Sequence, residues 1–186
     1  MKIDITLKIT PEMLKEAENN PNPALKGHLG THFDVMDKEF PLEYTRLEGV
    51  IFDVSGVVGR DIQISDVDTG RIKPNSFIAF HSGYSETEEY GTSAYYNEHP
   101  QLSMELIEFM LLKQVSVIGL DFAGVRRGKE HTPTDQLCAD KGVFIIENLR
   151  NMDKVINVGV DAVIHTYPLN CTGISGLPCR VIAEIN

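Results

Sequence analysis

Three absences restrict what this chain can be. It has only three cysteines among 186 residues, and they form no C-x-x-C pair. This low, odd count is typical of free thiols in a reducing cytosol and not of a disulfide framework or a zinc knuckle. No apolar run approaches the roughly 20 residues that a bilayer-spanning helix needs. Charged side chains are scattered through residues 1–20 where a signal peptide would have its apolar segment, so we expect a cytoplasmic protein.

Positive charge is also scarce. Lysine and arginine contribute 17 residues against 27 aspartates and glutamates, which gives a formal net charge of −10. An acidic surface repels phosphate backbones, so we expect no nucleic-acid partner. The hydrophobic fraction of 42% is ordinary for a folded globular protein, and no repeat or low-complexity segment is present. The length predicts a single domain over residues 1–186.

The hydrophobic pattern predicts short strands interspersed with a few helices. Strands are expected at residues 2–9, 49–54, 76–81, 115–121, 143–146, 160–165 and 179–185. Helix N-caps are expected at Thr10, at Ser103 and at either Thr134 or Asp135. Residues 82–98 and 122–134 are expected to form polar loops. Because the strands are short and outnumber the helices, we predict an α/β fold with mixed sheets.

The densest group of metal-ligating side chains is the segment HLGTHFD at residues 28–34. In a strand His28, Gly30, His32 and Asp34 share one face, whereas on a helix Asp34 would lie about 240° around the axis from His28. A straight strand would hold the two histidines about 13 Å apart, too far to share an ion. Gly30 tolerates a sharp bend between them. The pattern therefore favours a bent strand or strand-edge loop around a transition metal such as zinc, with a solvated strand as the alternative.

This segment resembles the start of the HxGTHxDxPxH signature of the cyclase family of metal-dependent hydrolases, which includes bacterial kynurenine formamidases. Further similarities occur in the family's order along nearly the whole chain: KIDITLKI at 2–9, FIAFHSGY at 77–84, SAYYNEHPQLS at 93–103, VIGLD at 117–121, GVFIIENLRNMD at 142–153 and YPLNCTGISGLPCRVIAEI at 167–185. The resemblance implies a swivelling β/β/α-type domain that assembles as a homodimer or homotetramer.

The resemblance also implies further metal ligands. Glu147 matches the glutamate of the family's ENL segment, and it follows the apolar run VFII, where a carboxylate needs a partner or a cation. The family's histidine ligand a dozen residues earlier corresponds to Asp135, for which helix capping is an equally good explanation. His131 could substitute if the register differs. The implied metal ligands are His28, His32, Asp34, Asp135 and Glu147.

Two positions depart from the family signature. Its proline and its final histidine, which resembles a general acid/base, are replaced by Met36 and Lys38. A bound cation and a dry pocket would both favour a neutral amine, so Lys38 could titrate low enough to act as the catalytic base. A surface lysine in a site that has lost its activity is the equal alternative.

Several other side chains could carry chemistry. His81, His99 and His165 have no partner identifiable from the sequence and are expected to be structural. The aromatic residues Phe33, Tyr84, Tyr95 and Tyr96 could line a substrate pocket, although core packing is the default for each.

Together these features predict a metal-dependent amide hydrolase similar to arylformamidases. One or two ions, zinc or alternatively manganese, would lower the pKa of bound water towards ~7 and so supply hydroxide. The resemblance implies a small-molecule substrate such as N-formylkynurenine, as in tryptophan catabolism, or another aryl or small cyclic amide. The alternatives are a non-catalytic family member that binds a metal or ligand, and a structural oligomer without metal.

Overall fold

The computed structural model describes residues 1–19, 27–159 and 161–185. Its strands are β1 Lys2–Asp4, β2 His32–Asp34, β3 Arg46–Asp53, β4 Phe77–His81, β5 Val117–Leu120, β6 Phe144–Glu147, β7 Ala162–Pro168 and β8 Gly176–Glu184. Its helices are α1 Pro11–Asn19, α2 Tyr84–Thr87, α3 Ser93–Asn97, α4 Met104–Leu112, α5 His131–Asp140 and α6 Met152–Ile156. Short 3-10 turns occur at Leu42–Thr45, Ile64–Asp66, Thr69–Arg71 and Gly128–Glu130.

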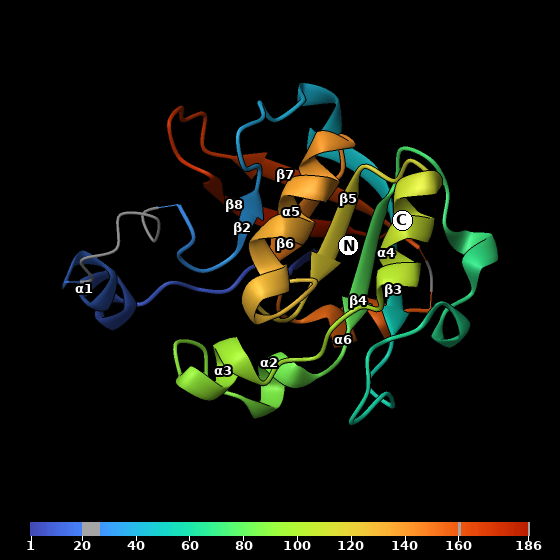
Figure 1. The fold of residues 1–186 in the computed structure, drawn as a ribbon, viewed down its shortest axis with the longest axis horizontal. Helices are drawn as coiled ribbons and strands as arrows, with labels where there is room; N and C mark the ends of the chain where they lie inside the picture. Colours follow the sequence, from blue (N-terminus) through green and yellow to red (C-terminus); the bar gives the residue numbers. More distant parts are fainter. Residues whose placement is uncertain (20–26, 160, 186) are drawn as a thin grey trace.

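The strands form one mixed sheet in the order β1-β8-β2-β6-β5-β4-β3-β7, and β7 also pairs with β8. This additional pairing closes strands β2 to β8 into a barrel, and β1 is added outside it on β8 (Figure 1). Three pairs are parallel: β3 with β4, β4 with β5, and β5 with β6. All the other pairs named here are antiparallel. The predicted α/β fold with a mixed sheet is therefore confirmed.

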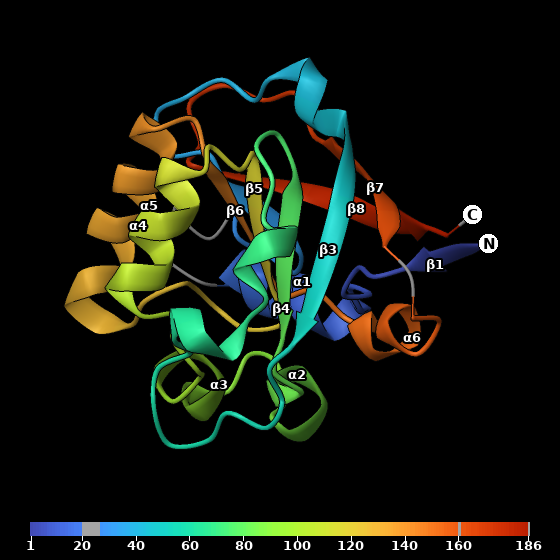
Figure 2. The same cartoon turned by 90° about the vertical axis from the view of Figure 1, so that its right-hand side faces the viewer.

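Alternation along the strands separates two apolar cores. One core takes side chains from every barrel strand and fills the interior; its members include Phe33, Leu47, Phe77, Val117, Phe144, Ile164 and Val181. The other core lies on the outer face of β3 to β6, beneath α4 and α5, which lie side by side on that face in Figure 2. Because Phe33 and Ile146 point inwards, their neighbours His32, Asp34 and Glu147 point to the outer face.

The caps at the start of two helices are as predicted. The Thr10 hydroxyl accepts a hydrogen bond from the Met13 amide at 3.3 Å, and the Ser103 hydroxyl accepts one from Leu106 at 3.2 Å. The sequence predicts that Pro21 and Pro23 end the helix that Thr10 caps, but both prolines lie outside the described residues. All three cysteines are free thiols, as the sequence predicted. No helix within the described ranges is both long and apolar enough to cross a membrane.

The first predicted strand is shorter than expected. β1 ends at Asp4 instead of continuing to residue 9. Beyond Ile5, the hydroxyl of Thr6 donates to the carbonyl of Val181 and accepts from its amide, at 3.1 and 2.8 Å. A side chain thus takes the place of the backbone partner of β8, and the regular ladder ends.

The two predicted loops are also more ordered than their polarity suggests. Residues 82–98 contain α2 and α3, and Tyr95 is fully buried. In the segment 122–134, Phe122 and Val125 are fully buried, and the last residues already belong to α5. Polar composition failed to predict these elements because single aromatic and aliphatic side chains anchor them in the core.

Candidate metal centre

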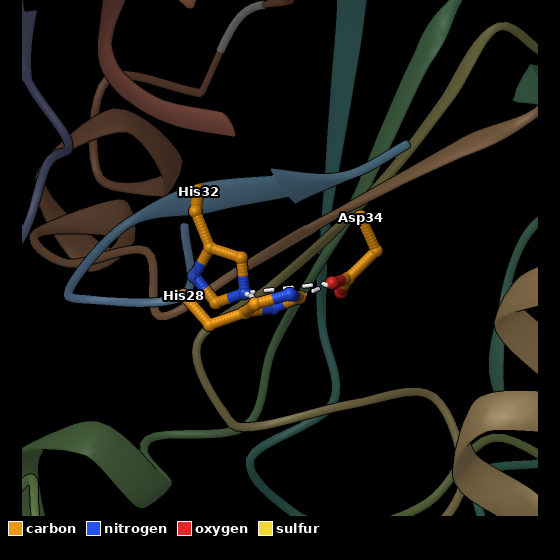
Figure 3. Close-up of side chains that lie close together, drawn as sticks. All are labelled: His28, His32 and Asp34. Carbon is orange, nitrogen blue, oxygen red and sulfur yellow. Dashed lines mark hydrogen bonds and ion pairs between the residues drawn. The ribbon is translucent and has the colours of Figure 1, made fainter. Parts of the chain in front are cut away.

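His28, His32 and Asp34 converge at the start of β2. The chain bends at Gly30, whose φ of +68° belongs to the left-handed region that glycine adopts readily. His28 Nδ1 lies 3.0 Å from His32 Nε2 and 3.0 Å from Asp34 Oδ1. His32 Nε2 lies 3.6 Å from the same Asp34 oxygen. Figure 3 shows both imidazoles and the carboxylate pointing toward one another. The bend at Gly30 thus brings the two histidines together, as the sequence spacing required.

Hydrogen bonds on the far side of each imidazole determine which nitrogen faces the cluster. His32 Nδ1 lies 2.9 Å from the Gly30 carbonyl, an obligate acceptor, so Nδ1–H donates and Nε2 carries a lone pair. His28 Nε2 lies 2.9 Å from the Ser175 hydroxyl, which leaves Nδ1 toward the cluster. Electron pairs this close repel unless a proton or a cation lies between them. Tetrahedral zinc with bonds of about 2.0–2.1 Å holds its donor atoms about 3.3 Å apart, so the three observed separations fit such an ion.

A second group of side chains adjoins the first. Glu147 lies directly opposite His32 in the β2–β6 register, with Oε2 3.6 Å from His32 Nε2. His131, at the start of α5, places Nε2 3.3 Å from Asp135 Oδ2 and 3.8 Å from Glu147 Oε1. His131 Nδ1 is 3.0 Å from the Arg126 carbonyl, so it donates there and Nε2 faces the carboxylates with a lone pair.

The carboxylates of this centre are buried and incompletely paired. Asp34 Oδ2, Asp135 Oδ1 and Glu147 Oε1 have no hydrogen-bond partner among the described residues. Burial, together with the charge of Asp34, raises the pKa of Asp135 to about 9 and raises the pKa of Glu147 well above its ordinary value. Burial also opposes ionisation of Asp34, but in the metal-free protein protonated imidazole of His32 and His28 attracts and donates to the carboxylate, which outweighs burial and holds the pKa of Asp34 low. A cation in this space would satisfy all three orphan oxygens, so the residues fit a metal.

The predicted capping role of Asp135 is wrong. Helix α5 begins at His131, and Asp135 lies one turn into the helix with 2% of its surface exposed. At that position its side chain faces Glu147 and His131 instead of the first-turn amides. The sequence offered His131 and Asp135 as alternatives, whereas the structure brings both to the centre.

The surroundings of Lys38 contradict the predicted low pKa. Its ammonium lies 2.7 Å from Asp140 and 3.0 Å from Asp37. The hydrogen bonds to these two carboxylates raise the pKa of Lys38 above its ordinary value. Among the described residues, the cavity beside the candidate centre is lined by Met36 and not by Lys38. A lysine held as a cation outside the cavity gives no support to a catalytic base at this position.

Sequence reasoning missed several residues that line or support this cavity of about 520 Å³. His99 lines it, and burial lowers the pKa of its imidazole to about 4. Asn148 donates to the Gly30 carbonyl at 2.9 Å and accepts from the buried Tyr95 hydroxyl at 2.9 Å, so it holds the bend between the two histidines. Its place directly after Glu147 was the one available signal.

The remaining histidines are structural, as expected. His81 lies 3.4 Å from the buried carboxylate of Asp121, and His165 lies 2.8 Å from Glu184. Neither histidine is among the described residues that line the cavity.

A family model described as "Putative cyclase" matches residues 3–126, two thirds of the chain. The protein belongs to the cyclase family. The matched range includes His28, His32 and Asp34 but ends before Asp135 and Glu147. No curated protein matches the sequence significantly.

Solved structures share the fold of this cyclase-family chain. One, described as a potential metal-dependent hydrolase with cyclase activity, has a TM-score of 0.75 at 24% identity and covers 98% of this chain and 96% of its own. A "predicted metal-dependent hydrolase" from Bacillus stearothermophilus has a TM-score of 0.74 at 24% identity, with coverages of 98% and 97%. Isatin hydrolase A from Labrenzia aggregata, bound to benzyl benzoate, has a TM-score of 0.75 at 18% identity, with coverages of 98% and 93%.

Proposed function

We propose that this cyclase-family protein is a metal-dependent hydrolase of aryl amides. The observation that carries the proposal is the convergence of three metal-ligating atoms, from His28, His32 and Asp34, at separations of 3.0–3.6 Å. Imidazole and carboxylate donors together suit zinc and also manganese. The structural neighbours described as metal-dependent hydrolases support the same class of chemistry.

The residues divide into two adjoining donor sets. His28, His32 and Asp34 would hold one ion, and His131 and Asp135 would hold a second, with Glu147 able to contact both sets. Bound ions would give the orphan oxygens a partner and would offset the burial and carboxylate repulsion that raise the pKa of Asp135 and of Glu147. We therefore propose one or two ions per chain.

A bound ion would polarise an amide carbonyl and lower the pKa of water in the cavity. The protein's own part is orientation and exclusion of solvent. The bonds from His32 to the Gly30 carbonyl and from His131 to the Arg126 carbonyl fix both imidazole tautomers. Tyr96, Met36 and Ala123 add apolar surface on which an aryl ring could pack.

Two substrates represent the proposed class. The resemblance to kynurenine formamidases suggests N-formylkynurenine, an open aryl formamide. The structural neighbours named isatin hydrolase suggest isatin, a cyclic aryl amide. Both reactions cleave a bond between a carbonyl carbon and an aryl nitrogen by addition of water.

The second candidate function is metal or ligand binding without catalysis. The specific observation in its favour is the replacement of the signature's proline and histidine by Met36 and by Lys38, which is held as a cation. Loss of a general acid/base typically costs 10²–10⁴-fold in rate.

Turnover by zinc- or manganese-loaded protein tests the proposal. We expect slow hydrolysis of N-formylkynurenine or isatin that disappears after chelation and in Asp34→Asn. Protein that retains its metal but hydrolyses neither substrate above the rate of Asp34→Asn would establish the binding function instead.

A further inference from the structure

The cavity beside the candidate metal centre contains one strong cation that is paired with no carboxylate of the described residues. Arg127 is the single lysine or arginine among the described residues that line the cavity. Its half-buried side chain donates from Nη1 to the carbonyl of Asn97 at 3.1 Å, and no carboxylate of the described residues pairs with it. A guanidinium has five N–H donors in a planar fork, so most of its hydrogen-bonding capacity is left for a ligand.

The neighbouring Arg126 has a structural role in the same loop and serves as a comparison. Its guanidinium lies 2.6 Å from Asp61 and 2.6 Å from Glu130, so its charge is balanced within the protein. Arg127, in contrast, is paired with no carboxylate of the described residues, although the chain has 27 acidic residues. Its backbone amide donates to Gln101 Oε1 at 2.8 Å, which fixes the position from which the side chain extends.

No second lysine or arginine accompanies Arg127 among the described residues that line the cavity at the metal centre. His99 Nδ1 lies 2.6 Å from the Pro100 carbonyl, so the neutral imidazole donates there, and its buried Nε2 has no partner among the described residues. Arg127 and His99 also line an adjoining hollow of about 570 Å³. Two other charged residues of that hollow, Arg60 and Asp61, are paired with Asp66 and Arg126, and Glu98 is its further acidic residue. A ligand that extends from the metal centre past His99 therefore has both space and a cation to meet.

We infer that Arg127 binds a carboxylate of the substrate, and that the substrates are aryl amides with an acidic group separate from the carbonyl that is hydrolysed. The part of this inference that concerns the hydrolysed substrate rests on the proposed function, whereas the binding of an anion by Arg127 does not. Guanidinium binds carboxylate through paired, charge-assisted hydrogen bonds, which gives direction as well as affinity. Isatin, which has no carboxylate, would then be a poorer ligand than an acidic formamide.

Calorimetric titration with aniline and with 2-, 3- and 4-aminobenzoate tests the inference. These probes contain no amide bond, so they report the anion site even if the protein hydrolyses nothing. We expect at least one aminobenzoate to bind wild-type protein about tenfold or more tightly than aniline, and Arg127→Gln to remove that preference. Arg127→Lys should retain part of it. Lys129→Gln, which removes an exposed, unpaired charge from the same loop outside the cavity lining, should leave it unchanged.

The titration is repeated with zinc-loaded and chelated protein, because a carboxylate can also bind a metal directly. A preference that depends on zinc but not on Arg127 would overturn the inference, as would equal losses in Arg127→Gln and Lys129→Gln. Equal affinities for aniline and all three acids, or no saturable binding of any acid by the wild type, would overturn it as well. None of these outcomes depends on catalysis, so they are separate from failure of the proposed hydrolase function.

Discussion

Lys38 shows how the neighbours of a single residue change the chemistry inferred from sequence. Its alignment with an acid/base histidine suggested a low-titrating amine, yet Asp37 and Asp140 stabilise its ammonium form. Asp37 is the preceding residue in the sequence, but Asp140 was not visible as a partner, because the last turn of α5 brings it there.

We predict that Lys38→Ala changes neither the metal content nor the hydrolysis rate. The side chain is 35% exposed and its ion pairs are solvated, so their loss should affect stability little. Parallel rate and metal measurements on Lys38→Ala and wild type check this. A clear fall in rate with full metal content would restore Lys38 as a catalytic group.

Asp135 makes the stability of the metal-free protein depend on pH. Its folded pKa of about 9 lies far above its ordinary value of 3.8, so between these values the native state holds a proton that the unfolded state has lost. The free energy of unfolding should therefore fall as pH rises through this interval. Glu147, whose pKa is also raised, acts in the same direction.

We predict that Asp135→Asn flattens this dependence, since an amide does not titrate. Urea unfolding of chelated protein at several pH values between about 5 and 8 measures the slope. Asp153→Asn, on α6 and outside the described cavity lining, is the matched control. An unchanged slope in Asp135→Asn would show that Asp135 ionises normally in the native state.

At the level of elements, the start of α5 determines how the second donor set forms. Gly124 has a φ of +113°, and a Cβ added there would lie 2.3 Å from His131 Nδ1. The loop before α5 can thus pass beside the imidazole only because residue 124 has no side chain. Gly128, in the same loop, has a φ of +58° with open space around it.

We predict that Gly124→Ala destabilises the protein by about 1–3 kcal/mol through backbone strain and displacement of His131. Gly128→Ala imposes the left-handed strain without the contact and should cost about 1 kcal/mol. Urea unfolding compares the two variants. Equal losses in both would mean that the contact with His131 is unimportant.

Local signals were sufficient for some elements and insufficient for others. Thr10 and Ser103 cap their helices through bonds within one turn, so sequence alone located them. Helix α5 has no side-chain cap at Glu130, and its beginning depends on tertiary contacts. The spacing of His28, His32 and Asp34 likewise predicted the bend at Gly30, because all its geometry lies within seven residues.

At the scale of the whole molecule, the closure of the barrel could not be read from the chain. The mixed α/β fold followed from the number and length of the strands. Closure also needs β7, which pairs with the neighbouring β8, to pair with β3, and that second pairing joins segments more than 100 residues apart. A separate long-range pairing, of β2 with β6, brings Glu147 opposite His32. His99 and Arg127 reach the cavity from separate loops, and no spacing in the sequence relates them to the histidine cluster.

Elemental analysis of purified protein shows whether the outer face of this barrel holds a transition metal. We predict one or two equivalents of zinc or manganese per chain in the wild type and a sharp loss in His32→Ala. His165→Ala, which removes a histidine paired with Glu184 on β7 and β8, should keep the full complement. Full metal content in His32→Ala, or none in the wild type after exposure to both metals, would contradict the account.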